Sequence, residues 1–298
     1  MTNPEHDGPE IFTERTPRVA NAAKLHRAAA RKKAGAFLVE GENSVEAAIA
    51  TGAANDVFVT EKAAERYEPV VRTAKYMNAY VHLITERAAD HLSDTSTTSG
   101  IFAVCKPVLW TTGKAIAGSP QLVSVPVLTS DPGNAGTLIR VSDAMGADAV
   151  VFAGETVDPQ SCKTVRASAG SLFHLPVARD TNIKDVLGQL RAKGLQILAT
   201  AADGEVSLDD ADELLTKPTA WLFGNEAHGL GEDLLAEADI RVSIPLRGRT
   251  ESLNSLLPPR SVFMNPPVRK LRRAAKKTDV LHDLQSSRTN STRVKPVG

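Results

Sequence analysis

Short apolar runs alternate with amphipathic stretches along most of the chain, and this pattern predicts an α/β fold. In the N-terminal third, the expected strands are 36–39, 56–60, 80–85 and 100–106, and the expected helices are 19–33, 43–51, 61–78 and 86–92. Regular alternation of this kind indicates a small domain in which helices pack on a sheet.

From residue 121 the apolar runs become more hydrophobic. The expected strands are 122–128, 149–152, 172–176, 196–200, 219–223 and 240–244, with helices at 137–145, 162–169, 182–193 and 231–236 between them. Runs without a polar face are typical of strands buried on both sides of a parallel sheet. The second half therefore also reads as α/β, with the helices as crossovers.

The pattern divides the chain into five segments: a flexible leader (1–14), a first α/β domain (15–106), a linker (107–120), a second α/β domain (121–258) and a basic tail (259–298). The linker carries two glycines and two prolines among small residues. Prolines and scattered charges in the tail favour disorder.

Composition limits the class of protein. At 298 residues, 42% hydrophobic and 23% charged, the chain can bury a sizeable core. No apolar run approaches the roughly 20 residues that span a bilayer, and the first 20 residues lack the apolar centre of a signal peptide, so we expect a cytoplasmic protein with no membrane contact. Cys105 and Cys162 are too few for a zinc site or a disulfide framework, which predicts reduced thiols.

A formal net charge of zero conceals two oppositely charged parts. Residues 259–298 hold 10 Lys and Arg against 2 Asp, a net of +8, which leaves −8 on residues 1–258. Within that acidic body, one basic cluster contains no acidic residue between its ends: Arg15, Arg18, Lys24, Arg27, Arg31, Lys32 and Lys33. Such a cluster either binds nucleic-acid phosphates or is a solvated helix face, and charge alone gives the two equal weight.

Three loops after expected strands carry the candidate chemistry, because open α/β sheets bind ligands there. In the first, residues 131–134 (DPGN) are expected to form a turn that brings Gly136 and Thr137 to a helix N-terminus, with Arg140 about one turn further on. The second, GNEAHGL at 224–230, combines glycines with polar Asn225 and Glu226. The third, 243–254, ends in a helix-capping Ser-Leu-Asn, yet two proline pairs follow where the helix should run.

These loops resemble the motifs of the SpoU (TrmH-like) family of S-adenosylmethionine-dependent RNA 2′-O-ribose methyltransferases, part of the SPOUT superfamily. The matching stretches are DPGNAGTLIR at 131–140, FGNEAHGL at 223–230 and IPLRGRTESLN at 244–254. The stretches GAFLVEG at 35–41 and TSTTSGIFAV at 95–104 are similar to a ribosomal-protein-like RNA-binding domain that precedes the catalytic domain in several members. The resemblance covers residues 15–254 and is closest to ribosomal RNA methyltransferases, including thiostrepton-resistance enzymes.

The resemblance implies an N-terminal α/β RNA-binding domain followed by a SPOUT domain, in which a parallel sheet contains a deep trefoil knot. It also implies a homodimer that binds S-adenosylmethionine and methylates RNA. Ribosomal RNA is the expected substrate, and tRNA is the alternative. By motif position, the catalytic residues would be Arg140, Asn134, Glu226, Ser252 and Asn254. The cofactor site would be lined by Leu222, Phe223, Gly224, Ile244, Leu246, Ser252 and Leu253, with Asn254 beside them.

Most of these residues also have a purely structural interpretation. Asn134 would hold its turn, Glu226 would cap a helix and Arg140 would be a solvated helix residue. Arg166 and Ser168 either bind RNA phosphate or cap and pair locally, at even odds. Clustering makes Arg27, Arg31, Lys32 and Lys33 the better RNA candidates.

The chain departs from the family pattern immediately after Asn254. Members continue with a long helix of small and apolar residues, whereas here the two proline pairs and the +8 tail follow. A shifted reading frame or a sequencing error near codon 255 is one explanation, and a genuine basic RNA-binding extension is the other. If the cell makes the chain as given, we expect weakened dimerisation and cofactor binding, so a catalytically impaired RNA-binding protein is the alternative to an active methyltransferase. A nucleotide hydrolase is poorly supported because the P-loop lysine motif is absent.

Overall fold

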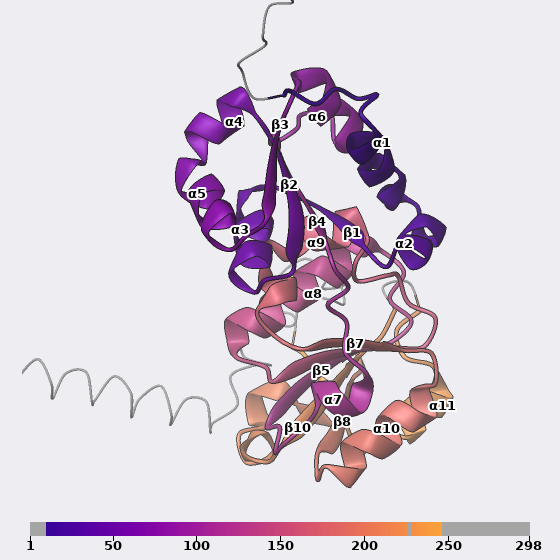
Figure 1. Cartoon of the computed structure of the whole chain (residues 1–298). Helices are drawn as coiled ribbons and strands as arrows, with labels where there is room; N and C mark the ends of the chain where they lie inside the picture. The colour runs from indigo at the N-terminus through magenta and orange to yellow at the C-terminus, as the bar shows by residue number, and fades with distance from the viewer. Residues whose placement is uncertain (1–9, 226–227, 246–298) are drawn as a thin grey trace, which may run out of the picture.

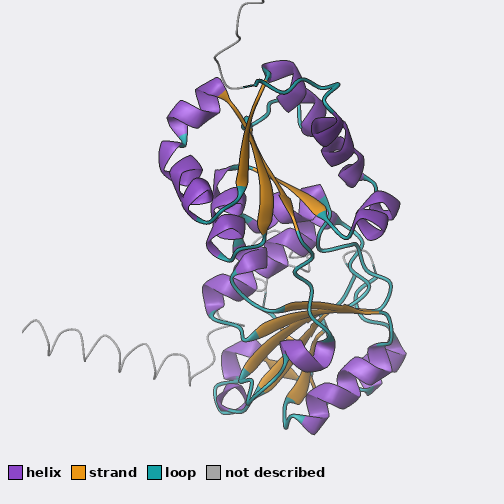
Figure 2. Ribbon diagram, in the orientation of Figure 1, coloured by secondary structure: helices purple, strands orange, loops and turns teal. Residues whose placement is uncertain are grey.

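The computed structural model describes residues 10–225 and 228–245. These residues form two sheets, one in each half of the chain, with helices on both faces of each (Figures 1 and 2). Most of the leader, Glu226, the basic tail and the stretch expected to complete the knot lie outside the described residues. No helix within the described ranges is long and apolar enough to cross a membrane.

The first sheet has four strands in the order β1-β4-β2-β3. They are β1 (Phe37–Glu40), β2 (Ala54–Thr60), β3 (Tyr80–Ile84) and β4 (Ile101–Cys105); β4 runs antiparallel to β1 and β2, and β2 is parallel to β3. Because side chains alternate along a strand, Phe37 and Val39 face one core while Leu38 faces the other. Helices α3 (Glu42–Ala50), α4 (Glu61–Arg66) and α5 (Glu68–Tyr76) cover the first face; α1 (Pro17–Ala23), α2 (Ala28–Ala34) and α6 (Glu86–Leu92) lie on the other side (Figure 1).

Two helices expected to be continuous are each divided. The first breaks at Arg27, which adopts an extended conformation between a 3₁₀ turn (Lys24–His26) and α2. The second breaks at Tyr67, and Pro69 stands in the first turn of α5, where its missing N–H is tolerated. A proline inside a continuous helix would clash with the preceding turn, so the break accommodates it.

The second sheet has seven strands, and every pair in it is parallel, as the sequence predicted. The order is β7-β6-β5-β10-β8-β11-β9, formed by β5 (Leu122–Pro126), β6 (Ala149–Ala153), β7 (Val177–Asp180), β8 (Gln196–Thr200), β9 (Val206–Ser207), β10 (Thr219–Phe223) and β11 (Ile240–Ser243). Helices α8 (Pro132–Met145) and α9 (Cys162–Ser168) lie between the two sheets. The opposite face carries α7 (Thr112–Ala115), α10 (Ile183–Ala192) and α11 (Glu232–Ala236) (Figure 1).

The structure differs from the sequence-based expectation at three places in this half. The strand expected at 172–176 is a 3₁₀ turn (Ser171–Phe173) and a connection, and the strand itself is β7. The short β9 was not foreseen, because two residues carry no readable alternation. The expected linker contains α7, and the Trp110 backbone N–H donates to the Val177 carbonyl (2.8 Å), so this segment packs along the sheet edge.

Helices α8 and α9 join the two halves into one packed body. A single cluster of buried apolar residues includes Phe37 and Val39 from the first sheet, Ile139 and Val165 from these helices, and Phe152 from the second sheet. Helix α9 also lies along β1, which is an edge strand of the first sheet. Covering an edge strand protects its unpaired backbone groups.

Candidate active site

The three candidate loops follow strands of the second sheet, and the first two follow the adjacent strands β5 and β10. The Asn225 side-chain amide links them: its Nδ2 donates to the Leu128 carbonyl (2.8 Å) and lies 3.5 Å from Ser130 Oγ. The sequence predicted that these loops follow the carboxyl ends of parallel strands, and in the structure the first two are in contact. Of the third loop, only residues 243–245 are described, and among them Ile244 packs partly buried against the core; residues 246–254 lie outside the described ranges.

The expected DPGN turn is instead the first turn of α8. Asp131 caps the helix, because its Oδ1 accepts the backbone N–H of Asn134 (2.8 Å), and Pro132 occupies the first helical position. That hydrogen bond is the main cause of a lowered Asp131 pKa, and Lys163 Nζ, 3.3 Å from Oδ2, lowers it further. Asn134 thus stands in the first turn of the helix.

Arg140 lies just over two turns into α8 and is exposed. Among the described residues it takes part in no hydrogen bond or ion pair. A guanidinium is always protonated at neutral pH and presents a planar set of donors. Arg140 is therefore a fixed positive charge available to an anionic partner.

Gly136 has a packing role that the sequence did not reveal. A Cβ at this position would lie 2.4 Å from the Thr164 carbonyl oxygen and 2.5 Å from Ala167 Cβ. Both atoms belong to α9, so only glycine allows the two helices to cross this closely. The expected role of Gly136 at a helix N-terminus is wrong, because the helix begins four residues earlier.

The loop after β10 closes tightly. Asn225 and Gly229 exchange two backbone hydrogen bonds (3.0 and 2.8 Å), and a Cβ at Gly224 would lie 2.3 Å from the Gly229 carbonyl carbon. Glycine at 224 is thus required by the loop itself. The side chains of Leu222 and Phe223 are completely buried in separate cores. At the predicted cofactor site, a ligand would therefore contact the backbone of this loop and not these two side chains.

Two residues of the loop after β5 are unusual and were not singled out from the sequence. Leu128 has a φ of +53°, a strained conformation for a side chain with a Cβ, and is 41% exposed. Thr129 is fully buried, yet its Oγ1 has no hydrogen-bond partner among the described residues. Strain and an unpaired buried hydroxyl are both costly, and both cluster at ligand sites.

Arg31 does not lie on the surface as predicted, and the expectation that it binds RNA is corrected here. It is only 7% exposed: Nε and Nη2 donate to Asp158 Oδ2 (2.9 and 2.6 Å), and Nη1 donates to the carbonyls of Leu25 and His26 (3.0 and 2.9 Å). Asp158 follows β6, so this ion pair fixes α2 against the second half of the chain. Arg27, which precedes α2, and Lys32 and Lys33 within α2 remain exposed.

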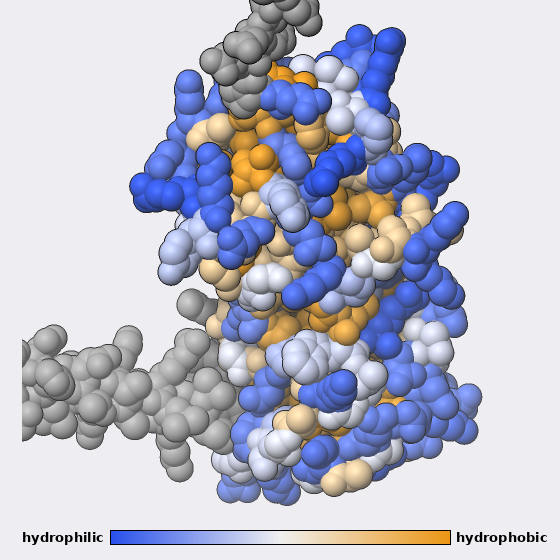
Figure 3. All heavy atoms as spheres, in the orientation of Figure 1, coloured by the Kyte–Doolittle hydropathy of each residue, from blue (hydrophilic) through white to orange (hydrophobic). Residues whose placement is uncertain are grey.

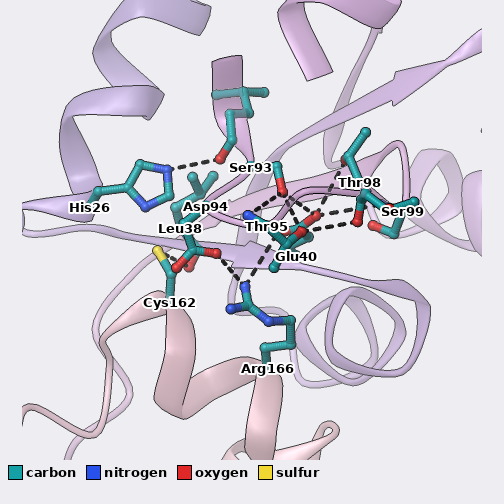
Figure 4. Close-up of polar contacts among 12 residues, drawn as sticks. His26, Leu38, Glu40, Ser93, Asp94, Thr95, Thr98, Ser99, Cys162 and Arg166 are labelled. Atoms are coloured by element: carbon teal, nitrogen blue, oxygen red, sulfur yellow. Dashed lines mark hydrogen bonds and ion pairs between the residues drawn. The ribbon is translucent and has the colours of Figure 1, made fainter. Parts of the chain in front are cut away.

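The other two predicted phosphate ligands bind protein groups: Ser168 pairs locally, as the competing interpretation held, whereas Arg166 pairs with residues far away in the sequence. Arg166 Nη1 contacts Asp94 Oδ1 (2.5 Å) and Glu40 Oε2 (3.4 Å), across the boundary between the two halves (Figure 4). Ser93 and Thr98 donate to the other oxygen of the same Glu40 carboxylate. Ser168 is buried, and its Oγ donates to the Val165 carbonyl (2.7 Å).

Neither cysteine has the properties of a nucleophile. Both are free, as predicted, and both are buried. Burial raises the pKa of Cys162 to about 12, and its Sγ lies 3.5 Å from the Leu38 carbonyl oxygen. Within the described ranges, no group of three His, Cys, Asp or Glu side chains could hold a metal ion.

Comparison with known proteins gives two family matches. Residues 121–256 match the SpoU rRNA methylase family, and residues 16–103 match the MRM3-like substrate binding domain. The chain is 30% identical over 246 residues to the 23S rRNA (guanosine(2553)-2′-O)-methyltransferase RlmP of Bacillus subtilis, covering 82% of this chain and 94% of that protein. It is 39% identical over 129 residues to a 23S rRNA (uridine(2479)-2′-O)-methyltransferase of Streptomyces viridochromogenes, covering 42% of this chain and 45% of that protein.

Among solved structures, the fold is similar to an AdoMet-bound rRNA methyltransferase from Sinorhizobium meliloti. The TM-score is 0.72 at 27% identity, and the superposition covers 89% of this chain and 98% of the other. The similarity therefore extends over both halves of the molecule.

Proposed function

The chain belongs to the SpoU family of RNA methylases, and on that premise we propose that it methylates a ribose 2′-hydroxyl of 23S ribosomal RNA with S-adenosylmethionine. The observation that carries the proposal is the pairing of the loops after β5 and β10 through Asn225, next to the helix that bears Asn134 and Arg140. The relatives act on a guanosine and on a uridine, so the identity of the methylated base is left open.

The residues present at this edge fit S-adenosylmethionine. The Thr129 hydroxyl, which has no partner among the described residues, and the backbone of the Gly224 loop offer hydrogen-bonding groups, and Leu128 offers apolar surface. We assign the cofactor to Gly224, Ile244 and, from the motif match, Leu246, Ser252 and Leu253. Bound there, it supplies a sulfonium methyl group, which already has an excellent leaving group.

The protein must then position the ribose hydroxyl and stabilise the charge that develops on its oxygen. We assign charge stabilisation to Arg140, because its fixed positive charge suits both an alkoxide and the neighbouring RNA phosphate. A guanidinium is a poor proton acceptor, because it stays protonated throughout the ordinary pH range. Asn134 and Glu226 are assigned as polar partners of the reacting group on motif grounds.

The direct test is methyl transfer from labelled S-adenosylmethionine to in vitro transcribed 23S rRNA. We expect label in ribosomal RNA, located at a ribose by resistance of the adjacent phosphodiester to alkali. A transcript carrying a 2′-deoxy nucleotide at the mapped position should accept no label there. Label on a base, or transfer to tRNA alone, would contradict the proposal.

The second candidate is an RNA-binding protein with impaired catalysis. It is favoured by one observation: the family match ends at residue 256, two residues after Asn254, where the proline-rich segment begins. Calorimetry separates the two candidates. A dissociation constant for S-adenosylmethionine in the micromolar range supports the enzyme, and absence of binding together with retained RNA affinity supports the impaired protein.

We further propose that the protein acts as a homodimer in the cytoplasm, with domains at 15–106 and 121–258 joined by residues 107–120. The two family matches support this division, since they stop and start within three residues of its inner boundaries, at 103 and 121. Sedimentation equilibrium tests the oligomeric state: a monomer at micromolar concentration would contradict the dimer.

A further inference from the structure

A cavity of about 530 Å³ opens on the first half of the molecule, away from the candidate active site. It lies where β2 and β3 begin, and it is lined by Arg18, Gly52, Ala54, Asn55, Asp56, Met77, Asn78 and Tyr80. Strand β3 is one edge of the first sheet, whereas the opposite edge, β1, is covered by α9. The cavity is therefore on the sheet edge that the catalytic half leaves open.

Tyr80 is an aromatic side chain that the fold does not use for packing. The chain has only three tyrosines and two tryptophans, and Tyr80 is 65% exposed. Met77, which also lines the cavity, is 43% exposed. Large apolar side chains gathered at the surface commonly mark an interaction site.

Arg18 is fixed over this tyrosine. Its Cζ lies 5.7 Å from the Tyr80 ring centroid, and its Nη1 donates to Asp56 Oδ1 (2.5 Å). His82 Nε2 lies 2.8 Å from the same Asp56 oxygen and 3.3 Å from Arg18 Nη1. Asp56 thus holds the guanidinium over one face of the Tyr80 ring, so that a cation and an exposed aromatic side chain stand together.

This combination suits an unpaired RNA base. Single-stranded nucleic acids bind by stacking bases on exposed aromatic rings beside Arg or Lys side chains. Asn55 and Asn78 add amide groups that both donate and accept hydrogen bonds, as the edges of bases do. The volume lies within the range of about 300–1,000 Å³ that is usual for small-ligand pockets.

The segment that carries Arg18 also connects the cavity to the catalytic half. Helices α1 and α2 are consecutive, and α2 is fixed to Asp158 by buried Arg31. Exposed Arg27, Lys32 and Lys33 follow Arg18 along this segment, and no acidic residue occurs from 15 to 33. Hydrophilic side chains project over α2 at the right of Figure 3. These charges offer binding groups to the phosphate backbone of an RNA that extends from the cavity to the candidate active site.

We propose that Tyr80 and Arg18 form a binding site for an unpaired base of the substrate RNA, remote from the nucleotide that is methylated. The proposal rests on RNA being the substrate, as argued above. It adds a contact on the first domain that anchors the RNA while the ribose is presented at the second sheet.

The test compares two exposed tyrosines that are four residues apart. Tyr80→Ala should weaken binding of a fluorescent 23S rRNA fragment by about tenfold in anisotropy titrations, the typical loss for one stacking residue. Tyr76→Ala is the matched control: Tyr76 is 84% exposed but does not line the cavity, so its removal should change affinity less than twofold. Tyr80→Trp should retain wild-type affinity, because indole also stacks. Cofactor affinity should be unchanged in all three variants.

Equal RNA affinity of the Tyr80→Ala and Tyr76→Ala variants would overturn the proposal. So would unchanged RNA affinity combined with loss of self-association in sedimentation, since the cavity would then be a protein contact. Because RNA binding is measured without methyl transfer, the proposal of a base-binding site at Tyr80 and the proposed methyltransferase activity are tested separately. A wild-type protein that binds RNA through Tyr80 but never methylates it would refute the proposed function and uphold this site.

Discussion

Single residues at the candidate active site are held by contacts that a linear motif does not display. Asn134 was expected to be a catalytic residue or to hold a turn; it lies in the first turn of α8, where its backbone N–H donates to the Asp131 cap. Arg140 was expected either as a catalytic group or as a solvated helix residue. Its exposed position and its lack of partners among the described residues are compatible with both, so a functional experiment must decide.

Replacing Arg140 with lysine is that experiment. Lysine keeps the charge but loses the planar array of donors, so a role in stabilising an alkoxide next to a phosphate should fail. We expect kcat to fall about 100-fold, the usual cost of one lost charge-stabilising donor, with little change in the affinity for S-adenosylmethionine.

Arg191→Lys provides the control, because Arg191 is an arginine of α10 that pairs with Glu237, away from the loops after β5 and β10. It should leave methyl transfer unchanged. Near-wild-type turnover by Arg140→Lys would exclude the geometry-dependent role.

At the scale of helices and strands, the alternation of apolar runs predicted most elements to within a few residues. The alternation did not predict the helix break at Arg27, which depends on contacts between residues far apart in the sequence. The break at Arg27 occurs beside Arg31, whose guanidinium binds the carbonyls of Leu25 and His26 and reaches Asp158, 127 positions away. No local pattern encodes that partner, which is also why Arg31 was taken for a surface residue and Asp158 was overlooked. The motifs, by contrast, predicted that the loops after β5 and β10 lie together, and the Asn225 contacts show that they do, because strand ends in a parallel sheet converge.

The crossing of α8 and α9 gives a sharp prediction at this scale. Gly136→Ala places a methyl group 2.4 Å from the Thr164 carbonyl oxygen, a backbone atom that cannot rotate away. We expect a loss of about 1–3 kcal/mol in the free energy of unfolding measured with urea.

Gly188→Ala is the control for helix propensity. Gly188 is also within a helix, α10, but a Cβ there meets nothing within 4 Å, so alanine should be neutral or stabilise by up to about 1 kcal/mol. Equal effects of the two substitutions would show that the close approach is unimportant.

At the scale of the whole molecule, the two halves are joined by more than their connecting segment. Domains within one chain usually move relative to each other unless the interface is large and apolar. Here the Arg31–Asp158 pair, the Arg166 contacts to Asp94 and Glu40, and the shared apolar cluster all span the boundary. The basic face of α2 is therefore held in a fixed position relative to the second sheet.

Asp158→Asn tests this connection. It leaves the buried Arg31 guanidinium without a counter-charge, so the free energy of unfolding should fall by about 2–4 kcal/mol, toward the range for broken buried ion pairs. We also expect the KM for RNA to rise several-fold while kcat and cofactor affinity change little, because α2 loses its fixed position.

Glu237→Gln is the matched control, since it removes the acidic partner of Arg191 in an exposed pair within the second half. An exposed ion pair contributes less than about 1 kcal/mol to the free energy of unfolding, and the Arg191–Glu237 pair does not cross the boundary between the two halves. A similar loss of stability and a similar KM for RNA in the two variants would contradict a positioning role for Asp158.

The placement of α9 along β1 also sets an order for folding during synthesis. Residues 37–105, which complete the first sheet, are synthesised before residues 162–168, and until α9 exists the edge strand β1 has no cover. An uncovered edge is where chains pair wrongly with one another. The first sheet therefore spends the time needed to translate about 60 further residues, a few seconds at typical rates, in its most aggregation-prone form.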